Sequence, residues 1–350
     1  MKREDANLAF MLQYENVAWY EGGKVRILDR RIYPTKIEFV TCYTHQEVAQ
    51  AIADMVTQSA GPYTAASMGM ALAADECKNL KEADQMSYLK EAAYRLSHAR
   101  PTTVNRMEMI VGGCLKVAEK ALKEGKPADE AIFLHTIGSM NRRYAKIGEV
   151  AKYLVDMFPD NGKIMTQCFG ETIVGMMLRE AKERQKNIKL FCPETRPYLQ
   201  GARLTSSVAY DMGYDVTVIT DNMPAFTMQT KGIDLFTSAA DSITMDGHVV
   251  NKVGTMQIAI AAKYFGIPYF VTGIPDEAYK SIDDVTIEER NPAEVLECRG
   301  IKNTLDGVKG YYPAFDITPP HLVSGVVTDR GIYSPYDLNR YYETETGNYW

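Results

Sequence analysis

Hydrophobic and polar residues follow two different rhythms along the chain. From Val17 to Tyr33 apolar and polar side chains alternate around Gly22-Gly23, which predicts a β-hairpin with a tight glycine turn. Apolar residues then recur at helical spacing, and we expect helices over His45–Val56, Tyr63–Lys78, Met86–Leu96, Asn105–Glu124 and Ala128–Phe158. The pattern predicts a small hairpin plus a mostly helical N-terminal domain, which we place at residues 1–150.

The rhythm changes after Pro159-Asp160-Asn161-Gly162, a cluster of turn-forming residues. Short β-type runs now alternate with helical segments of 10 to 15 residues. The expected strands are Lys163–Cys168, Ile188–Cys192, Asp215–Thr220, Ile233–Ala240 and Pro268–Thr272. Such alternation is typical of βαβ units in a parallel sheet. The predicted fold class is therefore α/β, with the parallel-sheet domain at residues 151–350.

Composition narrows the classes of function. The 350 residues are 46% hydrophobic and 24% charged, with a net charge of −6 and no run rich in Lys and Arg. These values are ordinary for a folded protein and disfavour a nucleic-acid partner. The charged N-terminus predicts no targeting peptide, and Lys263, Gly266 and Pro268 interrupt the most apolar stretch, so we expect no membrane span. We expect a cytoplasmic protein.

Cofactor and metal motifs are missing from the sequence. The six cysteines show no CxxC pair, the five histidines show no metal-ligand spacing, and no GxGxxG run occurs. The cysteines are expected to be reduced thiols, most of them packed as small hydrophobic residues. We therefore expect a site without cofactor and without metal.

Cys168 is a candidate functional residue because it lies at the end of a predicted strand. It lies at the carboxyl end of the first expected strand of the sheet, just before a helix expected near Gly170. Ligands of parallel sheets bind beyond the carboxyl ends of the strands, and a helix N-terminus lowers the pKa of a nearby thiol. A buried structural cysteine is the alternative.

The end of the second expected strand also carries polar residues. Pro193-Glu194-Thr195-Arg196-Pro197 and Gln200-Gly201-Ala202-Arg203 follow the second strand, where they would hold an anion and sugar hydroxyls or, alternatively, tie the loop together through a Glu-Arg pair.

Asp241 closes a later strand after small apolar residues, a setting that favours the neutral acid, although a turn or N-cap role is the alternative. Lys252, expected at the start of the following helix, is placed to meet a phosphate.

These residues belong to a longer pattern. The chain resembles the methylthioribose-1-phosphate isomerase family, within the wider group that includes regulatory subunits of the initiation factor 2B complex. The resemblance rests on collinear segments from about residue 50 to 330, namely Ala99-Arg100-Pro101-Thr102-Thr103-Val104-Asn105, Glu194-Thr195-Arg196-Pro197, Gln200 to Thr205, Ile219 to Met223, Ala240 to Ile243, Asn251 to Thr255, Glu288 to Pro292 and Pro313 to Pro319.

The resemblance implies a helical N-terminal domain, a Rossmann-like catalytic domain and a homodimer. It implies that the chain isomerises a sugar 1-phosphate from aldose to ketose, as in methionine salvage, without a cofactor or metal. Cys168 and Asp241 would be the catalytic residues. The substrate would be bound by Ala60, Arg100, Gln200, Asn251 and Lys252.

The chain departs from the family pattern around the expected pocket. Family members usually carry Arg-Gly-Ala-Pro-Ala where this chain has Gln58-Ser59-Ala60-Gly61-Pro62, and Thr-His-Cys-Asn where it has Thr166-Gln167-Cys168-Phe169. A 5-deoxyribose 1-phosphate is therefore as good a candidate substrate as 5-methylthioribose 1-phosphate. A regulatory protein that senses sugar phosphates or nucleotides without converting them is the alternative reading, because fold similarity does not carry function.

Overall fold

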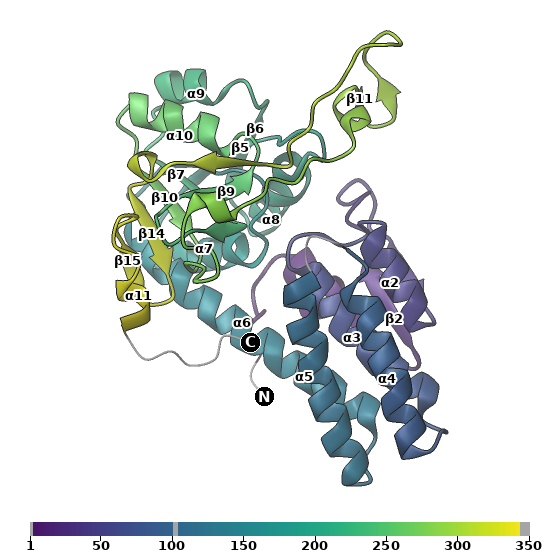
Figure 1. Ribbon diagram of the computed structural model, residues 1–350. Coiled ribbons are helices and arrows are strands. Elements are labelled where there is room, and N and C mark those ends of the chain that lie inside the picture. The colour runs from purple at the N-terminus through teal and green to yellow at the C-terminus, as the bar shows by residue number, and fades with distance from the viewer. Residues whose placement is uncertain (1–2, 101–103, 344–350) are drawn as a thin grey trace. The chain divides into compact units, whose positions relative to one another are not determined.

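The computed structural model describes residues 3–100 and 104–343, and the chain divides into two compact units between Ala145 and Lys146 (Figure 1). The predicted boundary after residue 150 falls within α6 (Ala128–Asp156), a helix that runs through this division. The Pro101-Thr102-Thr103 part of the family motif lies outside the described residues.

The first unit begins with a short antiparallel sheet. After η1 (Phe10–Leu12) and α1 (Tyr14–Val17), strands β1 (Ala18–Glu21) and β2 (Lys24–Leu28) form the predicted hairpin, and β3 (Phe39–Cys42) pairs with β2. Gly22 and Gly23 both have positive φ, at 56° and 73°, as the two-residue turn of such a hairpin requires. The hairpin prediction is confirmed, and β3 was not predicted.

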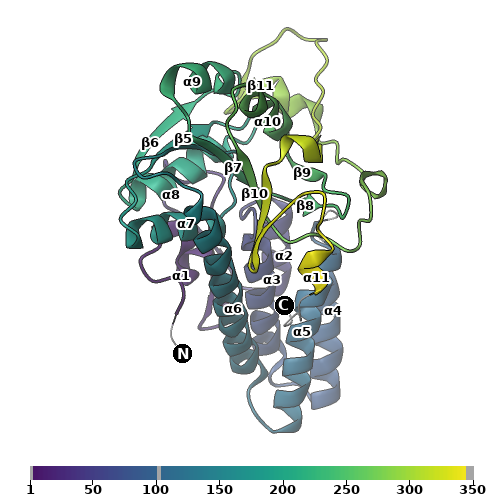
Figure 2. The ribbon, with the colours of Figure 1, turned by 90° about the vertical axis from the view of Figure 1, so that its left-hand side faces the viewer.

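Four further helices of this unit are α2 (His45–Ala53), α3 (Gly61–Cys77), α4 (Glu82–Ser97) and α5 (Val104–Lys123). Together with α6 they confirm the five predicted helices (Figure 2). Helix α3 is buried along almost its whole length because its side chains are small or apolar on every side, and it contacts α2, α4 and α5. None of the helices within residues 3–100 and 104–343 is long and apolar enough to cross a membrane.

The second unit is built on a seven-stranded sheet of order β15-β14-β10-β7-β4-β5-β6. Its strands are β4 (Lys163–Met165), β5 (Lys189–Pro193), β6 (Asp215–Ile219), β7 (Leu235–Ala239), β10 (Tyr269–Thr272), β14 (Gly325–Thr328) and β15 (Gly331–Tyr333). All neighbours are parallel except β15, which runs antiparallel to β14. The predicted parallel sheet is confirmed, and the last two strands are additions to the prediction.

Helices α7 (Thr172–Glu183), α8 (Ser206–Asp211), α9 (Pro224–Lys231) and α10 (Thr255–Tyr264) make the crossovers. A π-helical turn, η3 (Gly201–Thr205), leads directly into α8. Helix α7 contacts α8 and helix α9 contacts α10, so the crossovers form two pairs. The core contains the buried strand residues Met165, Phe191, Phe236, Val271 and Val326.

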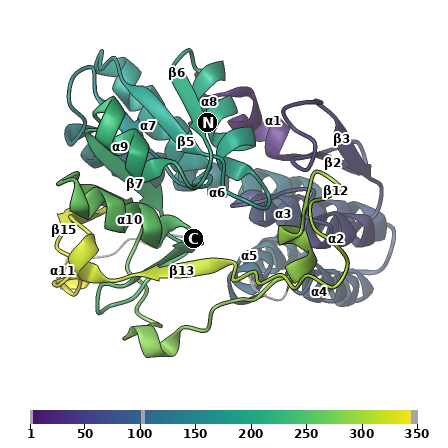
Figure 3. The ribbon, with the colours of Figure 1, turned by 90° about the horizontal axis from the view of Figure 1, so that it is seen from above.

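A second, three-stranded antiparallel sheet was not predicted, and it includes Lys252, which we expected at a helix start. It is formed by β8 (Ser242–Ile243), β9 (Val249–Lys252) and β13 (Phe315–Thr318), and Figure 3 shows β13 beside α10. The chain between β10 and β13 contains η4 (Ile282–Asp284), η5 (Pro292–Val295) and the short hairpin β11 (Glu297–Cys298) and β12 (Ile301–Lys302). The elements η6 (Pro320–Leu322) and α11 (Arg340–Glu343) complete the unit.

Candidate active site

The sheet reverses its direction of growth between β4 and β7. Strands β4, β5 and β6 extend it to one side, whereas β7, β10 and β14 extend it to the other. Cys168 follows β4 and Asp241 follows β7, so the two residues flank this switch point. A Cβ built on Gly170 would lie 3.1 Å from the Cβ of Ala239, which shows that the loop after β4 approaches the end of β7 closely. Ligands of open α/β sheets bind at such a position.

The backbone around Cys168 is held by the loop after β5. The Cys168 amide donates to the Thr195 hydroxyl at 3.2 Å, and the Thr205 hydroxyl donates to the Cys168 carbonyl. Cys168 has a φ of 57° and remains partly exposed. Helix α7 begins at Thr172, later than expected, so the thiol lies outside its first turn.

The thiol of Cys168 is protonated at neutral pH. Burial raises its pKa to about 11, and the nearby Asp241 carboxylate adds to the rise, whereas Lys252, the Phe169 amide and Arg290 oppose it. The prediction of a lowered pKa is wrong because desolvation outweighs the helix end. Asp241, Lys252 and Arg290 are thus all close enough to the thiol to act on it electrostatically.

Lys252 is the last residue of β9 and not, as predicted, the first of a helix. Only 4% of it is exposed, and its ammonium donates to the Ala314 carbonyl at 2.8 Å. The nitrogen lies 4.7 Å from the ring centroid of Phe315 and 5.9 Å from that of Tyr312. Burial lowers the pKa of Lys252, and the neighbouring Cys168 thiol and Asp241 counteract this shift.

Asp241 presents an exposed side chain at the end of β7, while its amide donates to the Val250 carbonyl at 2.9 Å. The exposed Asp241 side chain is therefore not in the apolar surroundings that we expected. The carboxylate faces a polar setting instead, beside Lys252 and the Cys168 thiol.

The two predicted amide side chains, Gln200 and Asn251, make different contacts. Gln200 precedes the π-helical turn whose Thr205 holds Cys168, and its buried Oε1 accepts no hydrogen bond from the described residues. Asn251 precedes Lys252 in β9 and donates from Nδ2 to the Thr255 hydroxyl at 3.0 Å. Gln200 thus keeps an acceptor open for a ligand.

The two arginines after β5 hold the loop. Arg203 donates from Nε and Nη2 to the Tyr198 carbonyl at 3.0 and 2.7 Å. Arg196 donates to the carbonyls of Glu294 and Glu297. The acceptors of these bonds are backbone carbonyl oxygens and not the carboxylate of the Glu-Arg alternative.

Ala60 and Arg100 belong to the first unit. Ala60 is the N-cap residue of α3, and Arg100 follows α4; both are partly exposed. The fully buried Arg30 donates from Nη1 to the Gln58 carbonyl at 2.7 Å and so supports the turn before α3. It stabilises the segment in which the family's usual arginine is replaced.

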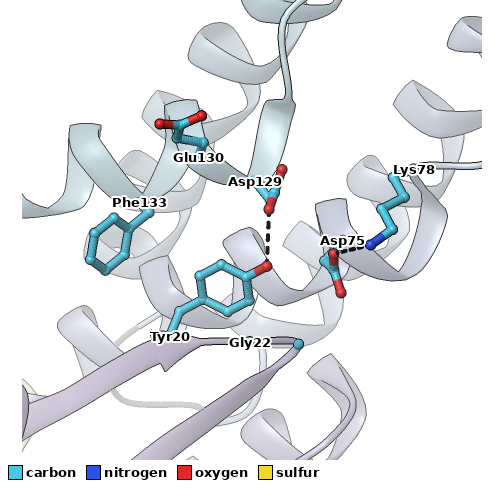
Figure 4. A pocket seen from close by; sticks show the side chains of 8 residues that line it. Tyr20, Gly22, Asp75, Lys78, Asp129, Glu130 and Phe133 are labelled. Atoms are coloured by element: carbon cyan, nitrogen blue, oxygen red, sulfur yellow. Dashed lines mark hydrogen bonds and ion pairs between the residues drawn. The ribbon is translucent and has the colours of Figure 1, made fainter.

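A hollow of about 560 Å³ in the first unit is unsuited to a phosphate (Figure 4). Its lining includes the carboxylates of Asp75, Asp129 and Glu130. The Tyr20 hydroxyl donates to Asp129 at 3.0 Å, and Lys78 pairs with Asp75 at 2.8 Å. Negative charge dominates this lining. Over the described ranges, no three His, Cys, Asp or Glu side chains cluster as a metal site.

Arg290 and its partner Glu288 are functional candidates that the sequence did not assign a role. Arg290 donates from Nε and Nη2 to the two carboxylate oxygens of Glu288 at 2.9 and 3.2 Å. It also contributes to the electrostatics of Cys168 and Lys252. Both residues lie in the Glu288 to Pro292 segment of the family pattern, which was the available signal.

Known proteins resemble this chain over nearly its full length. It is 37% identical to a 5-deoxyribose 1-phosphate isomerase of Clostridium botulinum over 347 residues, covering 92% of this chain and 96% of that protein. It is 34% identical to a methylthioribose-1-phosphate isomerase of Chloroflexus aurantiacus over 343 residues, covering 94% and 98%.

Solved structures share the fold. The 5-methylthioribose 1-phosphate isomerase of Pyrococcus horikoshii superposes with a TM-score of 0.83 at 29% identity, over 96% of this chain and 99% of that one. Subunit delta of translation initiation factor eIF-2B from A. fulgidus gives 0.82 at 29% identity, over 94% and 99%. The model of the initiation factor 2 subunit family matches residues 58–335. Together with the two sequence relatives, this match shows that the chain belongs to that family.

Proposed function

We propose that this protein is an aldose-ketose isomerase that converts a 5-substituted ribose 1-phosphate to the corresponding ribulose 1-phosphate. The substrates named for its relatives, 5-deoxyribose 1-phosphate and methylthioribose 1-phosphate, define this class. The observation that carries the proposal is that Cys168 and Asp241 flank the switch point of the sheet, with the buried Lys252 close enough to act on the thiol.

The reaction needs an acid because the phosphate on the anomeric oxygen locks the sugar as a ring. In our proposal Asp241 protonates the ring oxygen, so that the C1 to ring-oxygen bond breaks. A hydrogen then passes from C2 to C1, as a hydride or through an enediol, so C2 is oxidised and C1 is reduced. The O2 proton passes to the Asp241 carboxylate as the C2 carbonyl forms, which restores the acid.

Cys168 is proposed to stabilise the transition state of this transfer or to shuttle the proton between C2 and C1. Its thiol is protonated at neutral pH, since its pKa is about 11, so in the hydride route it acts as a hydrogen-bond donor and transfers no proton. A positioned acid or base contributes about 10² to 10⁴-fold to a rate. No cofactor or metal enters this scheme.

The substrate-binding residues in this proposal are Ala60, Arg100, Gln200, Asn251 and Lys252. The Lys252 ammonium supplies positive charge, and the open Oε1 of Gln200 supplies an acceptor for a sugar hydroxyl. Ala60 and Arg100 of the first unit are included on the family resemblance.

The test is conversion of a panel of sugars followed by ¹³C and ³¹P NMR. The panel contains 5-methylthioribose, 5-deoxyribose and unsubstituted ribose 1-phosphates. We expect a ketose product from at least one 5-substituted sugar. Conversion of the methylthio sugar would place the protein in methionine salvage. If no 5-substituted sugar is converted, the proposal is wrong.

The second candidate is a regulatory protein that binds sugar phosphates or nucleotides without converting them. The similarity to subunit delta of eIF-2B supports it. Cys168 and Asp241 favour the enzyme, because a binding protein has no chemical need for both. Binding of a panel member without conversion would favour the regulatory protein.

A further inference from the structure

Tyr312 carries a buried hydroxyl beside the Arg290 guanidinium. Only 3% of the residue is exposed, and no described residue, Arg290 included, gives the hydroxyl a hydrogen bond of normal geometry. Leaving a buried polar group unpaired costs about 1 to 3 kcal/mol. Tyr312 therefore has unused hydrogen-bonding capacity in the interior of the second unit.

Strand pairing brings this hydroxyl to the candidate active site. Lys252 of β9 lies opposite Phe315 of β13, and the chain enters β13 through Tyr312. On the other side, the Arg290 amide donates to the Tyr312 carbonyl at 3.0 Å and the Ala314 amide donates to the Glu288 carbonyl at 2.8 Å. Tyr312 thus lies between Lys252 and Arg290.

Two cations converge on this position. The guanidinium carbon of Arg290 lies 5.6 Å from the Phe315 ring centroid, and the Lys252 nitrogen lies 4.7 Å from the same centroid. Glu288 accepts hydrogen bonds from Nε and Nη2 of Arg290, and Nη1 takes no part in these two bonds. Within the described part of the chain, no carboxylate lies within ion-pair distance of Lys252.

An anion would satisfy all three groups. Lys252 uses one of its three donors on the Ala314 carbonyl, and the Tyr312 hydroxyl and the remaining Arg290 donors add to the set. Hydrogen bonds from cations to phosphate oxygens are among the strongest in proteins. The Tyr198 ring, 6.4 Å from the Tyr312 ring between centroids, packs beside the site.

We infer that Tyr312 is a further substrate-binding residue, whose hydroxyl donates a hydrogen bond to a phosphate oxygen of the sugar 1-phosphate beside Lys252 and Arg290. The inference rests on the proposed function for the identity of the phosphate ester. In this inference Tyr312, Lys252 and Arg290 together form a phosphate-binding subsite. Arg290 also positions Tyr312 through the backbone hydrogen bond between them.

The experiment compares Tyr312→Phe with Tyr311→Phe in the full chain. Tyr311 is adjacent in sequence and 70% exposed, so its variant controls for loss of a tyrosine hydroxyl. Binding of inorganic phosphate is measured by calorimetry, and kcat and KM are measured with the sugar 1-phosphate that is converted. Thermal unfolding without ligand reports on the fold.

We expect Tyr312→Phe to weaken phosphate binding and raise KM by about 10-fold or more, the usual effect of losing a hydrogen bond to a charged group. Tyr311→Phe should match the wild type. The unfolding temperature of Tyr312→Phe should change little, because no described residue makes a hydrogen bond of normal geometry to the hydroxyl.

Equal phosphate affinity in Tyr312→Phe and wild type would overturn the inference, as would a wild type that binds no phosphate. A raised KM with unchanged phosphate binding would also overturn it, since the hydroxyl would then contact the sugar. Tyr312-dependent phosphate binding without conversion of any sugar would uphold this inference and reject the proposed isomerase.

Discussion

At the scale of single residues, the thiol of Cys168 is controlled by two opposite charges. Asp241 raises its pKa and Lys252 lowers it, while burial sets the overall value of about 11. Substrate binding changes both neighbours in our proposal, because the phosphate meets Lys252 and the ring oxygen meets Asp241. The protonation of Cys168 would then depend on the ligand.

This arrangement predicts opposite effects of two substitutions on thiol reactivity. Asp241→Asn removes the negative charge that raises the Cys168 pKa, so alkylation of Cys168 by iodoacetamide at pH 8 should become faster. Lys252→Met should make it slower. The rates are measured by mass spectrometry of the Cys168 peptide, and Asp283→Asn, an exposed acid on η4, is the matched control.

Asp241→Asn should also reduce turnover by about 10² to 10⁴-fold, the usual contribution of a positioned acid. Its circular dichroism spectrum should remain that of the wild type, because the Asp241 side chain is exposed. Near-normal turnover in this variant would contradict the role of Asp241 as the acid.

At the scale of elements, the π-helical turn after β5 positions the Cys168 loop. Gly201 opens this turn against the end of β5, and a Cβ built on it would lie 1.8 Å from the Pro193 carbonyl oxygen. Thr205, at the end of the turn, donates to the Cys168 carbonyl. Irregular helical turns of this kind are frequent at functional sites.

We predict that Gly201→Ala lowers the free energy of unfolding by about 1 to 3 kcal/mol, the usual cost of overpacking. The backbone oxygen of Pro193 must move to admit the new methyl group. Gly112→Ala in α5 is the control, because its added Cβ meets nothing within 4 Å, and it should raise stability by about 0.5 to 1 kcal/mol. Urea unfolding measures both, and equal stability of the two variants would contradict the packing argument.

Asp316 gives β13 a pH-dependent contact with α10. Its carboxylate accepts hydrogen bonds from the amides of Gly254, at 2.7 Å, and Met256, at the start of α10. Burial nevertheless raises its pKa from 3.8 to about 6. Between these values the folded chain binds more protons than the unfolded chain, so the contribution of Asp316 to stability falls as pH rises.

We therefore predict that Asp316→Asn changes the pH dependence of stability. Asn keeps an acceptor for the amides but does not titrate. The free energy of unfolding of the variant, relative to wild type, should rise between about pH 4 and pH 6 and then level off. Urea unfolding across this range measures the difference, and parallel curves for the two proteins would show that the Asp316 pKa is ordinary.

At the scale of the whole molecule, the family resemblance predicts a homodimer. Light scattering after size exclusion should give a mass of twice the 39.2 kDa of the chain. The mass should persist on dilution to micromolar concentration. A mass of 39.2 kDa at all concentrations would contradict the prediction.

The sequence by itself determined the hairpin, the five N-terminal helices and the alternating strands and helices of the parallel sheet. These elements carry a local signal, because glycine turns and apolar spacing report directly on backbone conformation and on one buried face. The collinear motifs also identified the family, since they extend over most of the chain. Cys168 and Asp241 could be chosen because both end predicted strands.

Only the tertiary structure decided which residues meet at the site. The pairing of β9 with β13 brings Lys252 to Phe315 and Tyr312 across about sixty residues of intervening chain. Such pairing leaves no local pattern in a four-residue strand. The pKa of Cys168 depends likewise on burial and on charges from distant segments. Desolvation and long-range strand register are properties of the packed chain, so the sequence could name the thiol but not its protonation state or its neighbours.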